Sequence, residues 1–359
     1  MKLPFIHNMS KLKAVSPMKQ IQSQSCIYTV NSDEREELVK MFDSLPKMEG
    51  GIAPDDVALF EEIQSMSNHL PHGLLSKLDH FGRNSNKWGT LVIHGLPVDP
   101  DLPPTPTDGE PVDKATNYSE YALLTLLSRF GVPYADVREK KGRLIHQVSP
   151  RPGMENAQEN GGSTEWFELH TENIFLQPSM IPDIFALTCL RQGHDGGAST
   201  LTMSIENAKQ HLSEEDINIL SQPQFLFHFS SSYGQVGRMT EPRPVIHPGN
   251  LMTVDFADMS LVSHPGKSIF DLKDVPGATA LKHLKAALTQ PDVILEAKWE
   301  PGTMAIIDNL RAVHARKGFK AHYDGKDRWL QRAFSMDLGD FRGTQHLRVP
   351  GSHVFSQGL

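Results

Sequence analysis

The sequence contains very little cysteine. Its only two cysteines, Cys26 and Cys189, are too few for a disulfide framework or for a metal site built from cysteine ligands. We expect both to be ordinary thiols, buried or partly buried in the fold.

Positive charge and long apolar runs are also lacking. The net charge of −8 argues against a nucleic-acid-binding protein, which would present a basic face. No apolar run approaches the ~18 residues of a membrane span. Residues 1–25 contain four lysines but no arginine, whereas a transit peptide is rich in arginine and serine. We therefore expect a cytoplasmic protein in which residues 1–25 form a mobile or loosely docked arm.

Hydrophobic spacing predicts helices mainly in the first third of the chain and strands in the rest. A helix should start at Asn31, and further helices are expected at residues 57–66, 118–130, 205–212, 213–220 and 278–288. Strands are expected at residues 88–95, 184–190, 224–229, 251–256, 293–299, 304–308 and 328–336. Residues 102–107 contain three prolines and should form a connector. The pattern indicates one domain over residues 26–359, mainly β with flanking helices, with a sandwich or jelly-roll core.

The residues most informative about function are His170, Glu172, His314 and Arg328. Two imidazoles and one carboxylate are the protein ligands of the facial triad that holds non-haem Fe(II) and leaves coordination positions open. In an extended segment, His170 and Glu172 would point to the same side. His314 must come from another strand, and Arg328, 14 residues later, could anchor a dicarboxylate cosubstrate.

A histidine followed two residues later by an acid also arises by chance, and a structural histidine is then the alternative. A second such tripeptide, His322-Tyr323-Asp324, lies in a polar segment, and no arginine lies 14 residues after its candidate third ligands, His346 and His353. His170-Thr171-Glu172 differs because the complete downstream set accompanies it.

Residues 168–175, 308–316 and 323–332 resemble the clavaminate synthase-like Fe(II)/2-oxoglutarate oxygenases. Within that group, the sequence is most similar to hydroxylases of free arginine, lysine and asparagine, and residues 102–107 resemble the lysine hydroxylase branch. The resemblance runs discontinuously from about residue 88 to residue 345. It implies a double-stranded β-helix (jelly-roll) core with an insert between the two metal-ligand blocks.

The resemblance also implies roles for individual residues. His170, Glu172 and His314 would bind Fe(II). Arg328 would pair with the far carboxylate of 2-oxoglutarate, and Thr200, or Ser199 if the loop length differs, would hydrogen-bond the same cosubstrate. A carboxylate at position 172 disfavours a halogenase, which has a small residue there.

Several residues are candidates for substrate binding. Arg332 would hold the α-carboxylate of an amino acid, the alternative being a surface ion pair. His146, or Gln147 if the alignment shifts by one, would contact the α-amino group. Asp255 and Asp258 would bind a cationic side chain, the alternative being a turn that contains aspartate. Ser163, with Glu165, would belong to a lid over residues 151–165.

These expectations combine into one predicted reaction. The chain would hydroxylate a free basic L-amino acid, lysine or arginine, at C3 or C4, consuming O2 and converting 2-oxoglutarate to succinate and CO2. The alternatives are another amino acid, a carrier- or peptide-bound residue, and desaturation or cyclisation. A cupin-like metal-binding protein and a non-catalytic binding protein are the alternatives outside the oxygenases. The sequence leaves the oligomeric state open.

Overall fold

The computed structural model describes residues 26–48, 56–159, 161–194, 198–230, 233–235 and 237–356. The expected arm at residues 1–25 therefore lies outside the described part of the chain. Within that part, no helix has the length and apolar character needed to cross a membrane.

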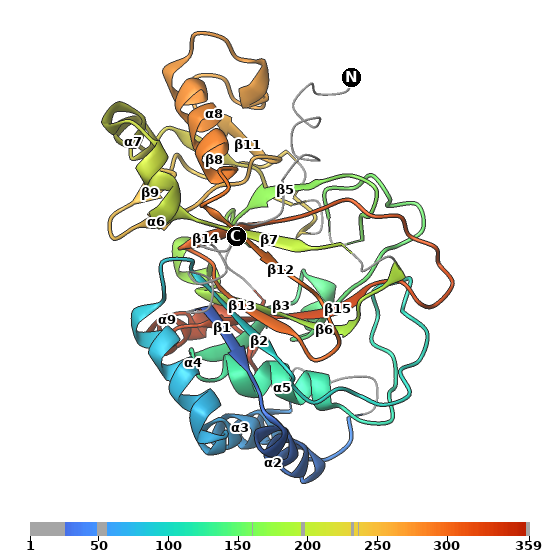
Figure 1. Ribbon diagram of the computed structural model, residues 1–359. Helices are drawn as coiled ribbons and strands as arrows, with labels where there is room; N and C mark the ends of the chain where they lie inside the picture. Colours follow the sequence, from blue (N-terminus) through green and yellow to red (C-terminus); the bar gives the residue numbers. More distant parts are fainter. Residues whose placement is uncertain are drawn as a thin grey trace.

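Two β sheets form the centre of the molecule (Figure 1). The larger sheet has the strand order β1 (Ile27–Thr29), β2 (Thr90–His94), β13 (Met304–Asp308), β6 (Ile184–Arg191), β15 (Trp329–Met336), β3 (Val132–Asp136) and β16 (Val354–Phe355), with β4 (His146–Val148) also paired to β15. The smaller sheet has the order β12 (Ile294–Ala297), β7 (Thr200–Ser204), β14 (Ala312–Arg316) and β5 (Phe167–His170). The Phe185 ring on β6 lies 4.7 Å from the His314 ring on β14, so the two sheets face each other.

Strand β13 shows how the sequence builds two layers of core. Ala305 and Ile307 join the cluster that contains Phe185 and packs between the sheets. Met304 and Ile306 join a second cluster, shared with the N-terminal helices. Successive strand residues point to opposite faces, so a continuous apolar run buries both faces of the larger sheet.

The outer face of the larger sheet is covered by α2 (Ser32–Asp43), α3 (Val57–Met66), α4 (His72–Asn84) and α5 (Tyr118–Leu127) (Figure 1). Helix α2 begins as predicted, because the Asn31 side chain accepts hydrogen bonds from Asp33 N and Glu34 N in a capping box. All ten residues of α5 except its first, Tyr118, are buried.

An insert that lies between His170 and His314 in the sequence forms a separate group beside the smaller sheet (Figure 1). It contains α6 (Ile205–Ala208), α7 (Glu214–Leu220), α8 (Pro276–Leu288) and the short strands β8 (Phe225–Phe227), β9 (Ile246–His247), β10 (Leu251–Met252) and β11 (Met259–Leu261). A final helix, α9 (Leu338–Gly343), follows β15.

Most predicted elements are present, but the expected strands did not include β3, β4, β7 or β16. The sequence analysis did not identify α4, although Leu74, Leu78 and Phe81 recur on its buried face. The strand expected at residues 251–256 ends at Met252, because the following backbone bonds irregularly to Val245 and to Leu169 at the end of β5. The expectation for the cysteines is confirmed: both are buried and not disulfide-bonded, and burial raises the pKa of Cys26 to about 11 and that of Cys189 to about 12.

Candidate active site

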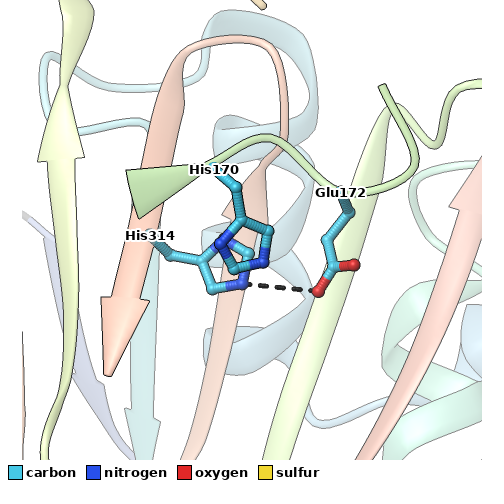
Figure 2. A group of neighbouring side chains, drawn as sticks. All are labelled: His170, Glu172 and His314. Atoms are coloured by element: carbon cyan, nitrogen blue, oxygen red, sulfur yellow. Dashed lines mark ion pairs between the residues drawn. The ribbon is translucent and has the colours of Figure 1, made fainter. Parts of the chain in front are cut away.

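The fold brings His170, Glu172 and His314 together between the sheets (Figure 2). His314 on β14 lies directly opposite His170 at the end of β5, and their ring centroids are 4.1 Å apart. The His314 Nε2 atom is 3.3 Å from Glu172 Oε1. One ligand atom from each side chain lies within 4.8 Å of the others, and all three residues are buried. Strand β5 ends at His170, so Glu172 lies just beyond the strand rather than within it.

Asn309, which the sequence analysis did not assign, fixes the backbone at Glu172. Its fully buried side chain accepts a hydrogen bond from Glu172 N at 2.9 Å and donates to Glu172 O at 3.1 Å. Thr171 N also donates to Val254 O, at 2.8 Å. These bonds position the Glu172 carboxylate without using the carboxylate itself.

The three side chains are in suitable protonation states to bind a divalent metal. His170 Nδ1 lies 2.7 Å from the Glu168 carbonyl oxygen, which can only accept, so its Nε2 carries the free lone pair. Burial, reinforced by His170, lowers the pKa of His314 to about 4. Burial alone would raise the pKa of Glu172, but Arg332 and His314 hold it well below its usual range. Two imidazoles and one carboxylate are the residue types of a non-haem Fe(II) centre.

Arg328 is a buried cation close to Thr200. Its Nη2 donates to Thr200 Oγ1 at 3.3 Å, and the Trp299 indole donates to the same oxygen at 3.1 Å. Burial lowers the pKa of Arg328 to about 9. Among the described residues no carboxylate forms an ion pair with it, and its Nε has no hydrogen-bond partner. An anionic ligand would relieve this uncompensated charge.

Arg332 is only 3% exposed, which excludes the alternative of a surface ion pair. Its guanidinium donates at 2.6 Å to Glu172 Oε1 and at 2.6 Å to Glu139 Oε1, and it lies 3.0 Å from His146 Nδ1. His146 is directly opposite Arg332 in the β4–β15 pairing. Gln147 accepts a hydrogen bond from the Trp329 indole at 2.7 Å instead. The structure thus brings His146, rather than Gln147, beside Arg332.

Glu139 is a site residue that the sequence analysis missed. Burial would raise its pKa, but His146 and Arg332 lower it to about 2. Tyr233 from the insert donates to its Oε2 at 3.2 Å. No motif surrounds Glu139, so its isolated position in a turn gave no signal.

The remaining candidates are more dispersed. Asp255 forms a β-bridge with His170, and burial raises its pKa to about 6. Its Oδ1 also accepts from Ala257 N and Asp258 N, as in the aspartate turn considered as an alternative. Asp258 itself is exposed. Ser163 is buried, and its carbonyl accepts from Phe319 N at 2.7 Å.

A second group of possible metal ligands contains His194, Asp324 and Asp327. It includes one residue of the competing tripeptide, Asp324, whose Oδ1 is 3.1 Å from His194 Nε2. Asp327 is occupied by the backbone amides of His322 and Tyr323. These carboxylates therefore stabilise a turn, and Asp324 is exposed, whereas all three residues of the triad are buried.

Comparisons with known proteins agree with this site. Residues 82–334 match the sequence family described as taurine catabolism dioxygenase TauD, TfdA family. The L-asparagine oxygenase of Streptomyces coelicolor is 33% identical over 306 residues, covering 84% of this chain and 86% of that protein. Clavaminate synthase 2 of Streptomyces clavuligerus is 30% identical over 308 residues, covering 84% and 89%. The L-lysine 3-hydroxylase of Catenulispora acidiphila is 28% identical over 305 residues, covering 82% and 80%.

A solved structure is similar over nearly the whole chain. It is that of an asparagine oxygenase in complex with Fe(II), 2S,3S-3-hydroxyasparagine and succinate. The TM-score is 0.82 at 30% sequence identity, covering 93% of this chain and 100% of the other. The likeness thus includes the helices as well as the sheets.

Proposed function

The chain belongs to the TauD/TfdA family of dioxygenases, and on that premise we propose that it hydroxylates a free basic L-amino acid, lysine or arginine, at C3 or C4. The reaction consumes O2 and 2-oxoglutarate and releases succinate and CO2. The observation that carries the proposal is the buried Arg332–Glu139 pair, which adjoins the metal ligand Glu172. We also infer that the two facing sheets form a double-stranded β-helix core.

His170, Glu172 and His314 would hold Fe(II), which with 2-oxoglutarate supplies the oxidising chemistry when both are bound. The lone pair of His170 Nε2 is available because Nδ1 is engaged with the Glu168 carbonyl. Arg328 and Thr200 would bind the far carboxylate of 2-oxoglutarate. A planar guanidinium suits that task because it donates two parallel hydrogen bonds to a carboxylate.

Arg332 and Glu139 offer opposite charges to a zwitterion. The α-carboxylate of an amino acid would bind Arg332, and its ammonium group would bind Glu139, assisted by His146. Without substrate, Arg332 and Glu139 form an ion pair with each other, with a distance of 2.6 Å between Nη2 and Oε1. Binding a zwitterion would therefore replace the buried pair between Arg332 and Glu139 with two new pairs, one to the substrate carboxylate and one to its ammonium group. Neither protein charge would be left without a partner.

The position of Asp255 favours a substrate with a basic side chain. Asp255 is a second acidic group beside the candidate metal ligands, since it forms a β-bridge with His170, and among the described residues no lysine or arginine forms an ion pair with it. A substrate ammonium or guanidinium would supply a cation, and Asp258 could add a weaker, exposed contribution. Asparagine is the rival substrate, because asparagine oxygenases are among the most similar proteins.

The test is anaerobic reconstitution with Fe(II), followed by turnover with O2, 2-oxoglutarate and a panel of free amino acids. We expect succinate release and a product 16 Da heavier with lysine or arginine. Hydroxylation of asparagine alone would refute the basic specificity. Reaction only with a carrier- or peptide-bound residue would refute the free substrate, and a loss of two mass units would indicate desaturation or cyclisation. A cupin-like protein would leave 2-oxoglutarate unchanged throughout.

A further inference from the structure

Arg316 is a second buried arginine near the proposed cosubstrate pocket, and the proposed function above does not use it. It is 6% exposed, and among the described residues no carboxylate forms an ion pair with it. Its Nη1 donates only to carbonyl oxygens, those of Ser163 at 3.3 Å and Lys317 at 3.5 Å. Its Nη2 is buried without a hydrogen-bond partner. A buried guanidinium in this state is costly unless a ligand completes it.

The strand register places Arg316 beside the groups assigned to the cosubstrate. Arg316 follows His314 by two residues on β14, so both side chains point to the same face of the smaller sheet. Its partner across the β14–β7 pairing is Thr200, the residue whose hydroxyl accepts from Arg328. Directly opposed residues have Cβ atoms about 5 Å apart. The metal ligand, Arg316 and Thr200 therefore lie side by side on one surface.

The charges of the two arginines are close enough to affect each other. Burial lowers the pKa of Arg328, and the neighbouring charge of Arg316 lowers it further. The pocket thus holds two cations that repel each other and lack a protein anion, in contrast to Arg332 with its two glutamates.

We propose that Arg316 is a second cation of the cosubstrate pocket, which together with Arg328 and Thr200 binds the carboxylate of 2-oxoglutarate that does not chelate the metal. A carboxylate has about four lone-pair sites and can accept from both guanidiniums. The inference rests on the proposed function, because it assumes the same cosubstrate. It adds a binding residue that also contacts the 151–165 segment, through the Ser163 carbonyl.

The test compares two 2-oxo acids that chelate iron alike. 2-Oxoglutarate has the far carboxylate, and 2-oxobutyrate lacks it. Both are titrated anaerobically into the Fe(II) protein without amino acid, and affinity is read from the metal-to-ligand charge-transfer band. In R316M, the preference for 2-oxoglutarate over 2-oxobutyrate should fall about tenfold, the loss of one charge-assisted hydrogen bond. R328M is the positive control and should lose at least as much.

Arg243 provides the matched control. It is another arginine without a carboxylate partner among the described residues, and it donates at 2.7 Å to the carbonyls of Ile174 and Leu176. R243M removes a structural arginine and should leave the preference unchanged. If R316M weakens both acids equally, or changes neither, Arg316 only braces the fold and the inference is wrong.

A second variant covers the case in which R316M does not fold. R316K keeps a charge but not the planar fork, so it should show a smaller loss of preference in the same direction; an unchanged preference would contradict the inference. A wild-type protein that gives no band with 2-oxoglutarate would refute the cosubstrate itself. Failure to hydroxylate any amino acid would leave this inference intact, because the titration contains none.

Discussion

At the scale of single residues, the arginines around the metal ligands differ in what neutralises them. Arg332 is held by two glutamates, whereas Arg328 has no carboxylate partner among the described residues. This difference supports different ligands for the two arginines. Under the proposed function, Arg332 would release a protein carboxylate when an amino acid binds, and Arg328 would gain an anionic partner.

We predict that Arg328→Met and Arg332→Met separate the two binding steps. Arg328→Met should raise the KM for 2-oxoglutarate about 10- to 100-fold, because it removes charge-assisted hydrogen bonds. Arg332→Met should raise the KM for the amino acid by a similar factor and change the affinity for 2-oxoglutarate little. Steady-state kinetics with each substrate varied in turn measure both effects. Equal changes in both KM values for either variant would contradict the assignment.

We predict that His314→Ala abolishes succinate formation while the far-ultraviolet circular dichroism stays unchanged. The substitution removes one of three metal ligands, and it does not remove a backbone hydrogen bond. Bound iron, measured after desalting, should fall to near zero. His247→Ala is the control, because His247 bonds Thr253 in the insert at 2.7 Å and touches no ligand of the triad. Retained turnover in His314→Ala would rule out the iron site.

The sequence predicted the cluster of candidate metal ligands but not the residues that support it. His170, Glu172 and His314 form a pattern that spacing and residue type reveal. Glu139 and Asn309 bond groups 193 and 137 residues away, and neither belongs to a local pattern. Their roles depend on tertiary neighbours, which one sequence does not display. For the same reason, the sequence left open whether His146 or Gln147 faces the site.

At the scale of elements, a buried polar network connects α5 to the strand that carries Arg332. Lys114 donates to Asp99 and to Glu120, the latter at 2.7 Å. Glu120 on α5 in turn accepts from Gln331 on β15 at 2.7 Å. The network thus positions β15 from the side opposite the metal ligands.

We predict that Lys114→Met destabilises the protein by about 3–5 kcal/mol, because it leaves two buried carboxylates without their cation. The free energy of unfolding from urea denaturation measures the effect. Lys141→Met is the control: its side chain is 75% exposed and pairs with Glu110 at the surface, so its loss should cost about 0.5 kcal/mol or less. A loss below about 1 kcal/mol in Lys114→Met would show that the network is not a stabilising brace.

Elements with a strong local pattern were predictable, and those defined by pairing were not. The strand at Met304–Asp308 was predicted at its observed bounds, because its apolar run is continuous and bounded by turns. Helix α4 was missed because glycine occupies two of its positions, Gly73 and Gly82, and weakens the helical signal. Strand β5 has only four residues, and its pairing with His314 defines it.

At the scale of the whole molecule, the candidate metal site joins parts of the chain that are distant in sequence. His170 and His314 lie on neighbouring strands of the smaller sheet, while Arg332 reaches Glu172 from the larger one. A metal held by the triad would therefore connect elements on both sides of the insert. Because such a site exists only in the folded state, metal binding should stabilise the entire fold.

We predict that removing the metal with a chelator lowers the melting temperature of the wild-type protein by several degrees. A ligand present at 100 times its Kd stabilises the folded state by about 2.7 kcal/mol, and the stabilisation disappears when the ligand is withdrawn. Adding Fe(II) or Mn(II) anaerobically should restore the original value, and 2-oxoglutarate should raise it further only when metal is present. His314→Ala should not respond to chelator or metal, which separates binding at the triad from binding at His194 and Asp324. A wild-type melting temperature that is insensitive to metal would contradict the site.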